Sequence, residues 1–288
     1  MKIAHAPGEL GRARRAAAIG TFDGVHLGHR AVLDAARATG LTATAITFDP
    51  HPRTVVGDGV ELLTTLERRL ELLGEAGMDE ALVIRFDDEL ASLTPEAFVD
   101  RYLQALGVEA VAAGGGFRFG NRRAGDLALL DRLGFDVLAV AFVEGVSSSA
   151  IRDLLRAGEV ERAAVALGRP AEVEGTVISG DARGTGLGFP TANLGVSEDM
   201  LVAANGIYAG SALGHPAAVS IGTNPHYGGS ERRVEAFLLD FEGDLYGRRL
   251  VVELWRRLRA ERAFESEEEL VAQIARDVEE TRAAERPA

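Results

Sequence analysis

The 288-residue chain has no cysteine, a single lysine (Lys2) and a single tryptophan. The absence of cysteine excludes disulfides, thiolate nucleophiles and cysteine-ligated metals. With its only lysine at position 2, the chain has no Schiff-base lysine and no P-loop lysine in its interior. No apolar run approaches the roughly 20 residues that a membrane helix needs. The first residues also lack the apolar core and cleavage site of a signal peptide, so we expect a cytoplasmic protein with no membrane partner.

Charge is biased towards acid, with 44 Asp and Glu against 31 Lys and Arg and a net charge of −13. Nonspecific binding of nucleic acid requires a cationic surface, so we expect no nucleic-acid partner. A nucleotide substrate is still compatible with this composition, because a few arginines and a helix N-terminus are enough to bind phosphates.

Strands and helices alternate in the first half of the chain. The hydrophobic pattern predicts strands at 16–20, 41–48, 81–86, 108–113 and 136–143, and helices at 28–39, 64–73, from 94 onward and at 148–156. Thr64 and Glu67 have the spacing of a capping box, and Thr94-Pro95 is a typical helix start. Regular alternation of this kind predicts an α/β domain with a parallel sheet and helices on both faces.

The second half consists mainly of strands separated by glycines and turns. We predict strands at 172–179, 206–212, 217–222, 233–241 and 249–257, which is typical of a small antiparallel β-barrel. Ser266 and Glu269 form a second capping box, which begins a closing helix. The character changes after a short predicted helix at 159–167. We therefore predict two domains, 1–169 and 170–288.

The segment from Gly20 to His29 reads Gly-Thr-Phe-Asp-Gly-Val-His-Leu-Gly-His and joins a predicted strand to a predicted helix. Helix N-termini at this edge of a parallel sheet bind anions. His26 and His29 lie on one helical face, and Gly28 allows close approach of a phosphate. Neutral imidazoles can donate hydrogen bonds to charge that develops on a phosphate. The alternatives are two surface histidines or a metal pair, although metal pairs more often have i, i+4 spacing.

A glycine-rich loop follows the first strand of the second half. Four of its nine residues are glycines, and the loop runs into Phe189-Pro190-Thr191-Ala192-Asn193; the glycines are Gly180, Gly184, Gly186 and Gly188, with Arg183 among them. Backbone amides in such a loop can surround phosphates, but the Lys-Ser/Thr ending of a P-loop is absent. Thr191 and Asn193 offer oxygen ligands that suit Mg²⁺.

Two further groups carry possible chemistry. Glu235 alternates with Phe237 and Leu239, so it is expected on an apolar strand face, where an unpaired carboxylate is costly. From the residues alone, pairing with a nearby arginine is the preferred explanation. Ser147, Ser148 and Ser149 precede a helix that carries Arg152 on its first turn, an arrangement that suits a phosphate clamp, although a single serine there would be an ordinary N-cap.

Taken in order, these motifs resemble the bacterial bifunctional riboflavin kinase/FMN adenylyltransferase family of the nucleotidylyltransferase superfamily. Supporting segments are Thr47-Phe48-Asp49-Pro50-His51-Pro52, Leu62-Leu63-Thr64, Phe117-Arg118-Phe119-Gly120, Asn205-Gly206-Ile207-Tyr208 and Asp244-Leu245-Tyr246-Gly247. The resemblance implies a Rossmann-like adenylyltransferase domain followed by a β-barrel kinase domain. The barrel would convert riboflavin and ATP to FMN, and the sheet domain would convert FMN and ATP to FAD and pyrophosphate, both with Mg²⁺.

The resemblance also implies roles for individual residues. His26 and His29 would be catalytic in adenylyl transfer, and Glu235 would be the general base of the kinase. Thr191 and Asn193 would hold the metal. Substrate-binding residues would be Gly20, Phe22, Asp23, Gly28, Ser147, Ser148, Ser149 and Arg152 in the first site, and Gly180, Arg183, Gly184, Gly186, Gly188, Pro190 and Asn224 in the second.

The chain departs from the family pattern in two places. Gly116 stands where the family has Asn or Asp, and His226-Tyr227 stands where it typically has Thr-Phe. The first departure leaves open a kinase with a degenerate adenylyltransferase domain. A non-catalytic flavin-binding regulatory protein is a further alternative, against which the intact Thr191, Asn193 and Glu235 argue.

Overall fold

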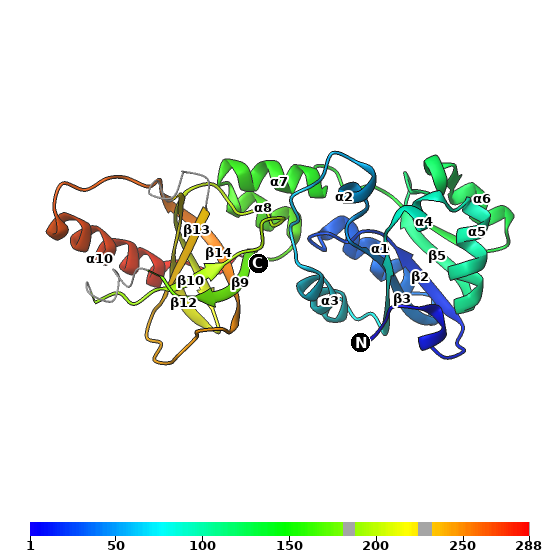
Figure 1. Cartoon of the computed structure of the whole chain (residues 1–288), viewed down its shortest axis with the longest axis horizontal. Coiled ribbons are helices and arrows are strands. Elements are labelled where there is room, and N and C mark those ends of the chain that lie inside the picture. The colour runs from blue at the N-terminus through cyan, green and yellow to red at the C-terminus, as the bar shows by residue number, and fades with distance from the viewer. Residues whose placement is uncertain (181–187, 224–231, 288) are drawn as a thin grey trace. The chain divides into compact units, whose positions relative to one another are not determined.

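A computed structural model describes residues 1–180, 188–223 and 232–287 of the chain (Figure 1). The chain divides into two compact units, Met1–Ser147 and Ser148–Ala288. The main sheet of the first unit is parallel, and the sheet of the second unit is an antiparallel closed barrel.

The first unit contains a six-stranded parallel sheet, as the alternating pattern predicts. Its strands are β1 (Lys2–Ala4), β2 (Arg15–Ile19), β3 (Thr42–Asp49), β4 (Glu80–Arg85), β5 (Val108–Gly114) and β8 (Asp136–Val140), in the order β1-β4-β3-β2-β5-β8. The larger helices are α1 (Leu27–Arg37), α3 (Leu66–Glu75), α5 (Pro95–Phe98, continued by a π-helical turn over Val99–Gln104) and α6 (Leu127–Arg132); α2 (Pro52–Val56) and α4 (Asp88–Ser92) are short.

The two faces of this sheet pack differently because residue size alternates along the strands. One face presents alanines from β2, β3, β4 and β5 to leucines and valines of α1 and α3. The other presents Ile19, Ile46 and Ile84 to Phe98 and Leu103. Small side chains let α1 approach the strands closely, so its N-terminus is held beside their carboxyl ends.

One predicted cap is shifted by a residue. The N-cap of α3 is Thr65, whose hydroxyl accepts a hydrogen bond from the Arg68 N–H at 3.0 Å, so the capping box at Thr64 and Glu67 is wrong. Thr64 Oγ1 instead accepts from the Gly24 N–H at 3.2 Å. A tertiary contact therefore replaces the local one. The caps at Thr94 and Ser266 are confirmed.

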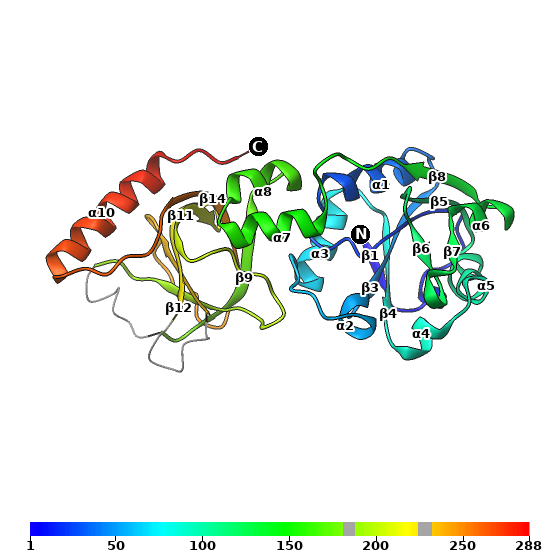
Figure 2. The same cartoon turned by 90° about the horizontal axis from the view of Figure 1, so that it is seen from above.

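The second unit is a closed antiparallel barrel, as predicted. Its strands are β9 (Ala171–Ile178), β10 (Ala192–Gly195), β11 (Gly206–Ala212), β12 (His215–Thr223), β13 (Arg232–Leu238) and β14 (Arg249–Arg259), in the closed order β10-β13-β12-β11-β14-β9. Helix α10 (Glu267–Ala283) packs against β11 and β12 (Figures 1 and 2). Among the described residues, no helix combines the length and apolarity needed to cross a bilayer.

Helices α7 (Ser148–Ala157) and α8 (Val160–Leu167) group with the barrel. Helix α8 packs on β9 and β14 and buries Val160, Ala163, Ala164, Ala166 and Leu167. The predicted domain start at residue 170 would omit both helices.

We expect a fragment of residues 148–288 to be more stable than one of residues 170–288 by about 3 kcal/mol or more, the scale of burying one valine and one leucine. Urea unfolding of the two fragments, followed by the fluorescence of Trp255, measures the difference. Equal midpoints would show that α8 adds nothing to the barrel.

Candidate nucleotide sites in the two units

The two histidines of the first motif lie at the start of α1. His26 is the N-cap of the helix, and its Nδ1 accepts a hydrogen bond from the His29 N–H at 3.3 Å. Because Nδ1 is the acceptor, a neutral His26 carries its proton on Nε2, which is then a donor. The structure thus brings together an imidazole donor and the positive end of a helix dipole.

The His26 and His29 rings stack with their centroids 3.6 Å apart, and the edge of Phe22 meets His29 at 5.4 Å. Burial lowers the pKa of His29 well below its ordinary value, and the neighbouring His26 and Arg69 lower it further. Nδ1 of His29 is buried and has no hydrogen-bond partner among the described residues. At neutral pH this ring is therefore an uncharged group, suited to hydrogen bonding with phosphate oxygens.

Asp23 anchors the loop before α1 to the segment before α3. This carboxylate is fully buried, and its Oδ1 accepts hydrogen bonds from the N–H groups of Leu63 at 2.9 Å and Thr64 at 3.1 Å. Phe22 and Val25 have left-handed backbones, with φ of 50° and 37°, which are unfavourable for a bulky or β-branched residue. Asp23, expected to bind substrate, thus lies behind the loop, where its bonds hold this strained conformation.

Two glycines of this motif lie close to aromatic rings. A Cβ at Gly28 would lie 3.2 Å from the His26 ring, and one at Gly20 would lie 3.2 Å from the Phe22 ring. The bare backbone at position 28 therefore makes room for the imidazole as well as for any phosphate.

A cavity of about 870 Å³ begins beside Gly20 and Thr21, the first residues of this loop. Five phenylalanines and four arginines contribute to its lining: Phe48, Phe86, Phe98, Phe117, Phe119, Arg53, Arg118, Arg122 and Arg123. The predicted loop at 114–126 folds into a short hairpin along this cavity, with β6 (Arg118–Phe119) paired to β7 (Gly125–Asp126). The arrangement suits a flat apolar ring that carries an anionic group.

Sequence reasoning did not single out Phe86, Phe98 or Arg53. Phe86 is the last residue of the predicted strand at 81–86, so its place at the carboxyl end of the sheet was the signal that could have identified it. Gly116 also lines the cavity, and a Cβ there would lie 3.0 Å from Cζ of Phe142.

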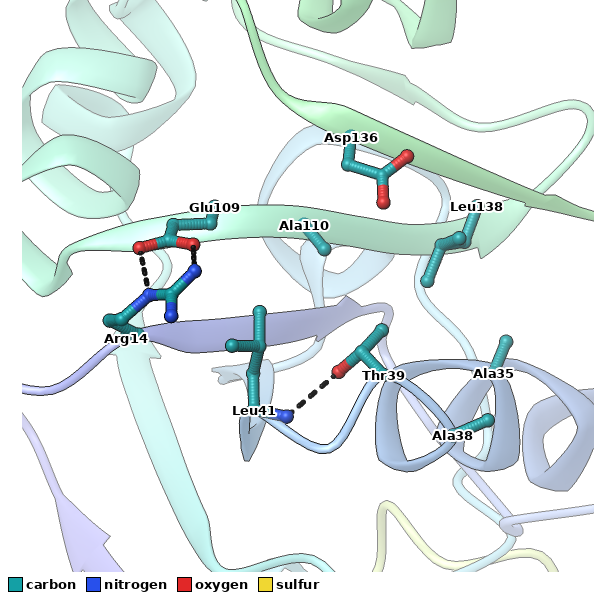
Figure 3. A pocket seen from close by; sticks show the side chains of 9 residues that line it. All are labelled: Arg14, Ala35, Ala38, Thr39, Leu41, Glu109, Ala110, Asp136 and Leu138. Carbon is teal, nitrogen blue, oxygen red and sulfur yellow. Dashed lines mark hydrogen bonds and ion pairs between the residues drawn. The ribbon is translucent and has the colours of Figure 1, made fainter.

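A second hollow, of about 500 Å³, lies at the amino ends of the strands of the same sheet (Figure 3). Arg14 donates two hydrogen bonds to Glu109 there, both at 2.7 Å, and Asp136 and the last turn of α1 complete the wall. The single arginine is neutralised by its partner, and a helix C-terminus repels anions. This hollow is therefore unsuited to phosphate.

The serine-rich motif spans the division between the units. Ser147 ends the first unit, whereas Ser148, Ser149 and Arg152 lie in α7 of the second. The Arg152 side chain is buried, with 5% exposed, and Ser147, Ser148 and Arg152 all have interaction partners. Their common role as a phosphate clamp stays a prediction.

In the barrel, three polar side chains form a row across neighbouring strands. Glu235 on β13 lies directly opposite Asn193 on β10 and Ser220 on β12. Opposite residues in antiparallel strands are about 5 Å apart at Cβ, so these side chains share one face. Thr191, two residues before Asn193, joins Glu235 and Ser220 in lining a cavity of about 300 Å³.

The face assigned to Glu235 needs correction. Val234, Ala236 and Leu238 fill the barrel core, so Glu235 and Phe237 are half-buried on the outer face, and β13 ends before Leu239. The pattern misled because Phe237 and Leu239 are large apolar residues that alternate with Glu235, although the barrel core is filled from the other face of β13. Arg233 Nη1 donates to Glu235 Oε1 at 3.2 Å, so the expected arginine partner is present as well.

The described part of the glycine-rich loop packs against this row. A Cβ at Gly180 would lie only 2.3 Å from the Asn193 side-chain amide, so glycine is needed there. Gly188 has φ +86°, and Pro190 is exposed. Arg183, Gly184, Gly186, Asn224 and His226-Tyr227 lie outside the described residues.

Helix α10 contributes Leu270, Ile274 and Asp277 to the wall of the barrel cavity. The Arg259 guanidinium donates to the Asp277 carboxylate at 2.6 and 2.9 Å, which fastens the helix to the end of β14. Arg259 and Asp277 were missed because their pairing joins distant segments. Within the described part of the chain, no group of three or more His, Cys, Asp or Glu is placed to hold a metal.

Comparison with known proteins gives two family matches. The family model described as riboflavin kinase matches residues 167–284, and the one described as FAD synthetase matches residues 11–151. Proteins named bifunctional riboflavin kinase/FMN adenylyltransferase are similar over most of their length. The one from Listeria monocytogenes is 39% identical over 92% of this chain and 91% of its own, and the one from Escherichia coli K12 is 38% identical over 90% and 89%.

A solved structure shares the whole fold. A Streptococcus pneumoniae protein, described as a macrolide-efflux protein, superposes with a TM-score of 0.86 at 29% identity, covering 97% of this chain and 98% of that one. The arrangement of a parallel-sheet unit and a barrel in one chain therefore recurs in a second protein.

The lowered pKa of His29 predicts that the stability of the first unit falls as the pH falls. Below about pH 6.5 an unfolded histidine binds a proton, while folded His29 stays neutral, so the unfolded state is favoured as pH falls. We expect His29 to lower the free energy of unfolding of the first unit by up to about 1.4 kcal/mol per pH unit as the pH falls from about 6.5 to 5.5. His29→Gln should flatten this dependence, measured by urea unfolding with circular dichroism.

His5, exposed in the same unit, provides the matched control. His5→Gln should retain the wild-type dependence on pH. If His29→Gln and the wild type lose stability in parallel, His29 titrates normally and its environment has been misread.

Proposed function

The chain belongs to the bifunctional riboflavin kinase/FMN adenylyltransferase family, and we propose that its two reactions are divided between its two units. The barrel phosphorylates riboflavin to FMN, with Glu235 as its base. The parallel-sheet unit adenylylates FMN to FAD, with His26 and His29 at its centre. The observation that carries this assignment is that each unit has its own cavity: the first begins at Gly20 and Thr21 of the histidine motif, and Thr191 and Glu235 line the second.

In the adenylyl transfer, a phosphate oxygen of FMN attacks the α-phosphorus of ATP, and pyrophosphate leaves. Negative charge builds on the α-phosphate oxygens, and a preorganised donor at that point lowers the barrier. The Nε2–H of His26, the neutral His29 ring and the N-terminal amides of α1 are such donors. Arginines along the 870 Å³ cavity suit the FMN phosphate, and its phenylalanines suit the flavin ring.

In the kinase reaction, Glu235 accepts the proton of the riboflavin 5′-hydroxyl as that oxygen attacks the γ-phosphorus of ATP, and ADP leaves. Arg233 fixes the carboxylate from one side, and Phe237 meets Phe189 edge to face at 5.5 Å in the same cavity. An oriented base beside an aromatic surface fits a hydroxyl carried by a ring system.

Mg²⁺ fits the residues present in the barrel. Thr191 and Asn193 offer neutral oxygen donors, and the Asn193 amide lies beside Gly180, at the root of the glycine-rich loop. When bound, the ion would neutralise phosphate charge. Thr191, Asn193 and the loop would orient the ATP phosphates towards Glu235.

Glu235→Gln should lower FMN formation by a factor of about 10² or more, the scale expected for loss of a general base. FMN adenylylation should be unchanged. Chromatographic assay of FMN from riboflavin, and of FAD from added FMN, measures the two steps separately. Glu242→Gln, on the exposed turn after β13, is the control. Equal loss of both activities in a folded Glu235→Gln protein would contradict the division between units.

Gly116→Asn should raise the rate of FAD formation about tenfold, since a hydrogen bond to a charged group is worth roughly 1.5–3 kcal/mol. Gly116 does not have a left-handed backbone, and the Phe142 ring beside it is 78% exposed and free to turn away. FMN formation serves as the internal control.

Phe142→Ala in the Gly116→Asn background shows whether the ring limits the gain. No increase in either variant would mean that the cavity needs no polar group at this position. Asn121 and Asp126 are poor substitutes, because Asn121 donates to the Ala91 carbonyl and Asp126 caps α6.

A further inference from the structure

One arginine in the first unit is buried without the partners that a buried charge normally has. The Arg69 side chain on α3 is 0% exposed. Its Nη1 donates to the Phe48 carbonyl at 3.0 Å and, at 3.4 Å, to Thr47 Oγ1. Its Nε and Nη2 are buried and have no hydrogen-bond partner among the described residues.

A second arginine of the same unit provides an internal comparison. Arg15 is 1% exposed, and its guanidinium is saturated: Nε donates to Glu80 at 2.7 Å, Nη1 to the Leu106 carbonyl at 2.5 Å and Nη2 to the Gly11 carbonyl at 2.8 Å. A fold that buries an arginine for structural reasons can therefore satisfy it. Arg69 retains positive charge that no contacting carboxylate in the described structure neutralises.

The charges that face Arg69 act from beyond ion-pair distance. Burial lowers the pKa of Arg69, and Asp23 and Asp49 partly offset that effect. Arg69 in turn is one of the groups that disfavour protonation of His29. Its positive field therefore reaches the stacked histidines at the start of α1, where a phosphate would be the missing counter-charge.

The hydrogen bonds of Arg69 connect the elements that form this site. Phe48 lies at the carboxyl end of β3, and Thr47 Oγ1 donates to the Thr21 carbonyl at 3.0 Å. Thr21 precedes Phe22, whose ring edge meets His29. Through the hydrogen bonds of Arg69 and Thr47, α3 is thus connected both to the end of β3 and to the loop that carries His26 and His29.

We propose that Arg69 is a positioning residue for the triphosphate of the adenylyl-transfer site: its buried charge attracts the anion to the His26–His29 loop, and its hydrogen bonds hold that loop against β3. This inference rests on the proposed role of His26 and His29. Because its side chain is inaccessible to solvent, Arg69 acts through the field and the loop and touches no substrate.

The test measures pyrophosphate affinity by calorimetry in the presence of Mg²⁺, using the full chain. Arg69→Met should weaken pyrophosphate binding at least tenfold and raise KM for ATP in FAD formation. Arg69→Lys keeps the charge and should restore most of the affinity. Arg68→Met is the matched control, because Arg68 lies next on the same helix and pairs with Glu71 and Glu75. It should leave affinity unchanged.

A second readout separates this role from a purely structural one. By NMR, the pKa of His29 should rise in Arg69→Met and stay low in Arg69→Lys. Should Arg69→Met fail to fold, Asp49→Asn takes its place: removing a charge that offsets Arg69 should tighten pyrophosphate binding severalfold. Unchanged affinity in Arg69→Met, or in Asp49→Asn if that variant is needed, overturns the proposal.

The inference and its premise fail in different ways. If His29→Ala leaves FAD formation intact, the assignment of the histidine site is wrong. If His29→Ala lowers FAD formation by about 10² while Arg69→Met binds pyrophosphate like the wild type, the site stands and only the role of Arg69 is lost.

Discussion

The hydrogen bonds from the N–H groups of Leu63 and Thr64 to the buried Asp23 carboxylate are the contacts on which the first site depends. They bind the loop after β2 to the segment before α3, and two non-glycine residues of that loop keep left-handed backbones. A charged acceptor of two amides is a strong anchor in a dry interior. With the loop fixed in this way, His26 can cap α1 and stack on His29, which gives the proposed anion site its shape.

In the barrel, strand register positions the polar residues of the proposed site. Asn193, Glu235 and Ser220 come from three strands, and antiparallel pairing sets them side by side on the outer face. The core beneath them is made by the alternate residues, so the polar row and the apolar packing are separate consequences of one pleat. Helix α10, tied to β14 through Arg259 and Asp277, then helps to enclose Glu235 and Ser220 of this row in a cavity.

The sequence predicted features that depend on local pattern and missed those that depend on contacts between distant segments. Alternating strands and helices indicated the parallel sheet, and the histidine motif lies at a helix start as expected. The strand β10 was missed because it is only four residues long and follows a glycine-rich loop. Thr64 was mistaken for a cap because its tertiary partners, Asp23 and Gly24, are 40 residues away. Phe86 and Arg53 become cavity residues only when the sheet is assembled.

The left-handed backbones of Phe22 and Val25 have a thermodynamic consequence. Each costs on the order of 1–3 kcal/mol, so an isolated segment of this sequence would not adopt the loop conformation. The contacts that impose it come from Leu63 and Thr64, at the entry to α3. Local unfolding of α3 would release the loop and abolish the proposed anion site before the sheet itself opened. If the first site binds a triphosphate as proposed, nucleotide binding and the ordering of α3 are linked equilibria, and the ligand would slow hydrogen exchange along a helix whose own backbone need not contact it.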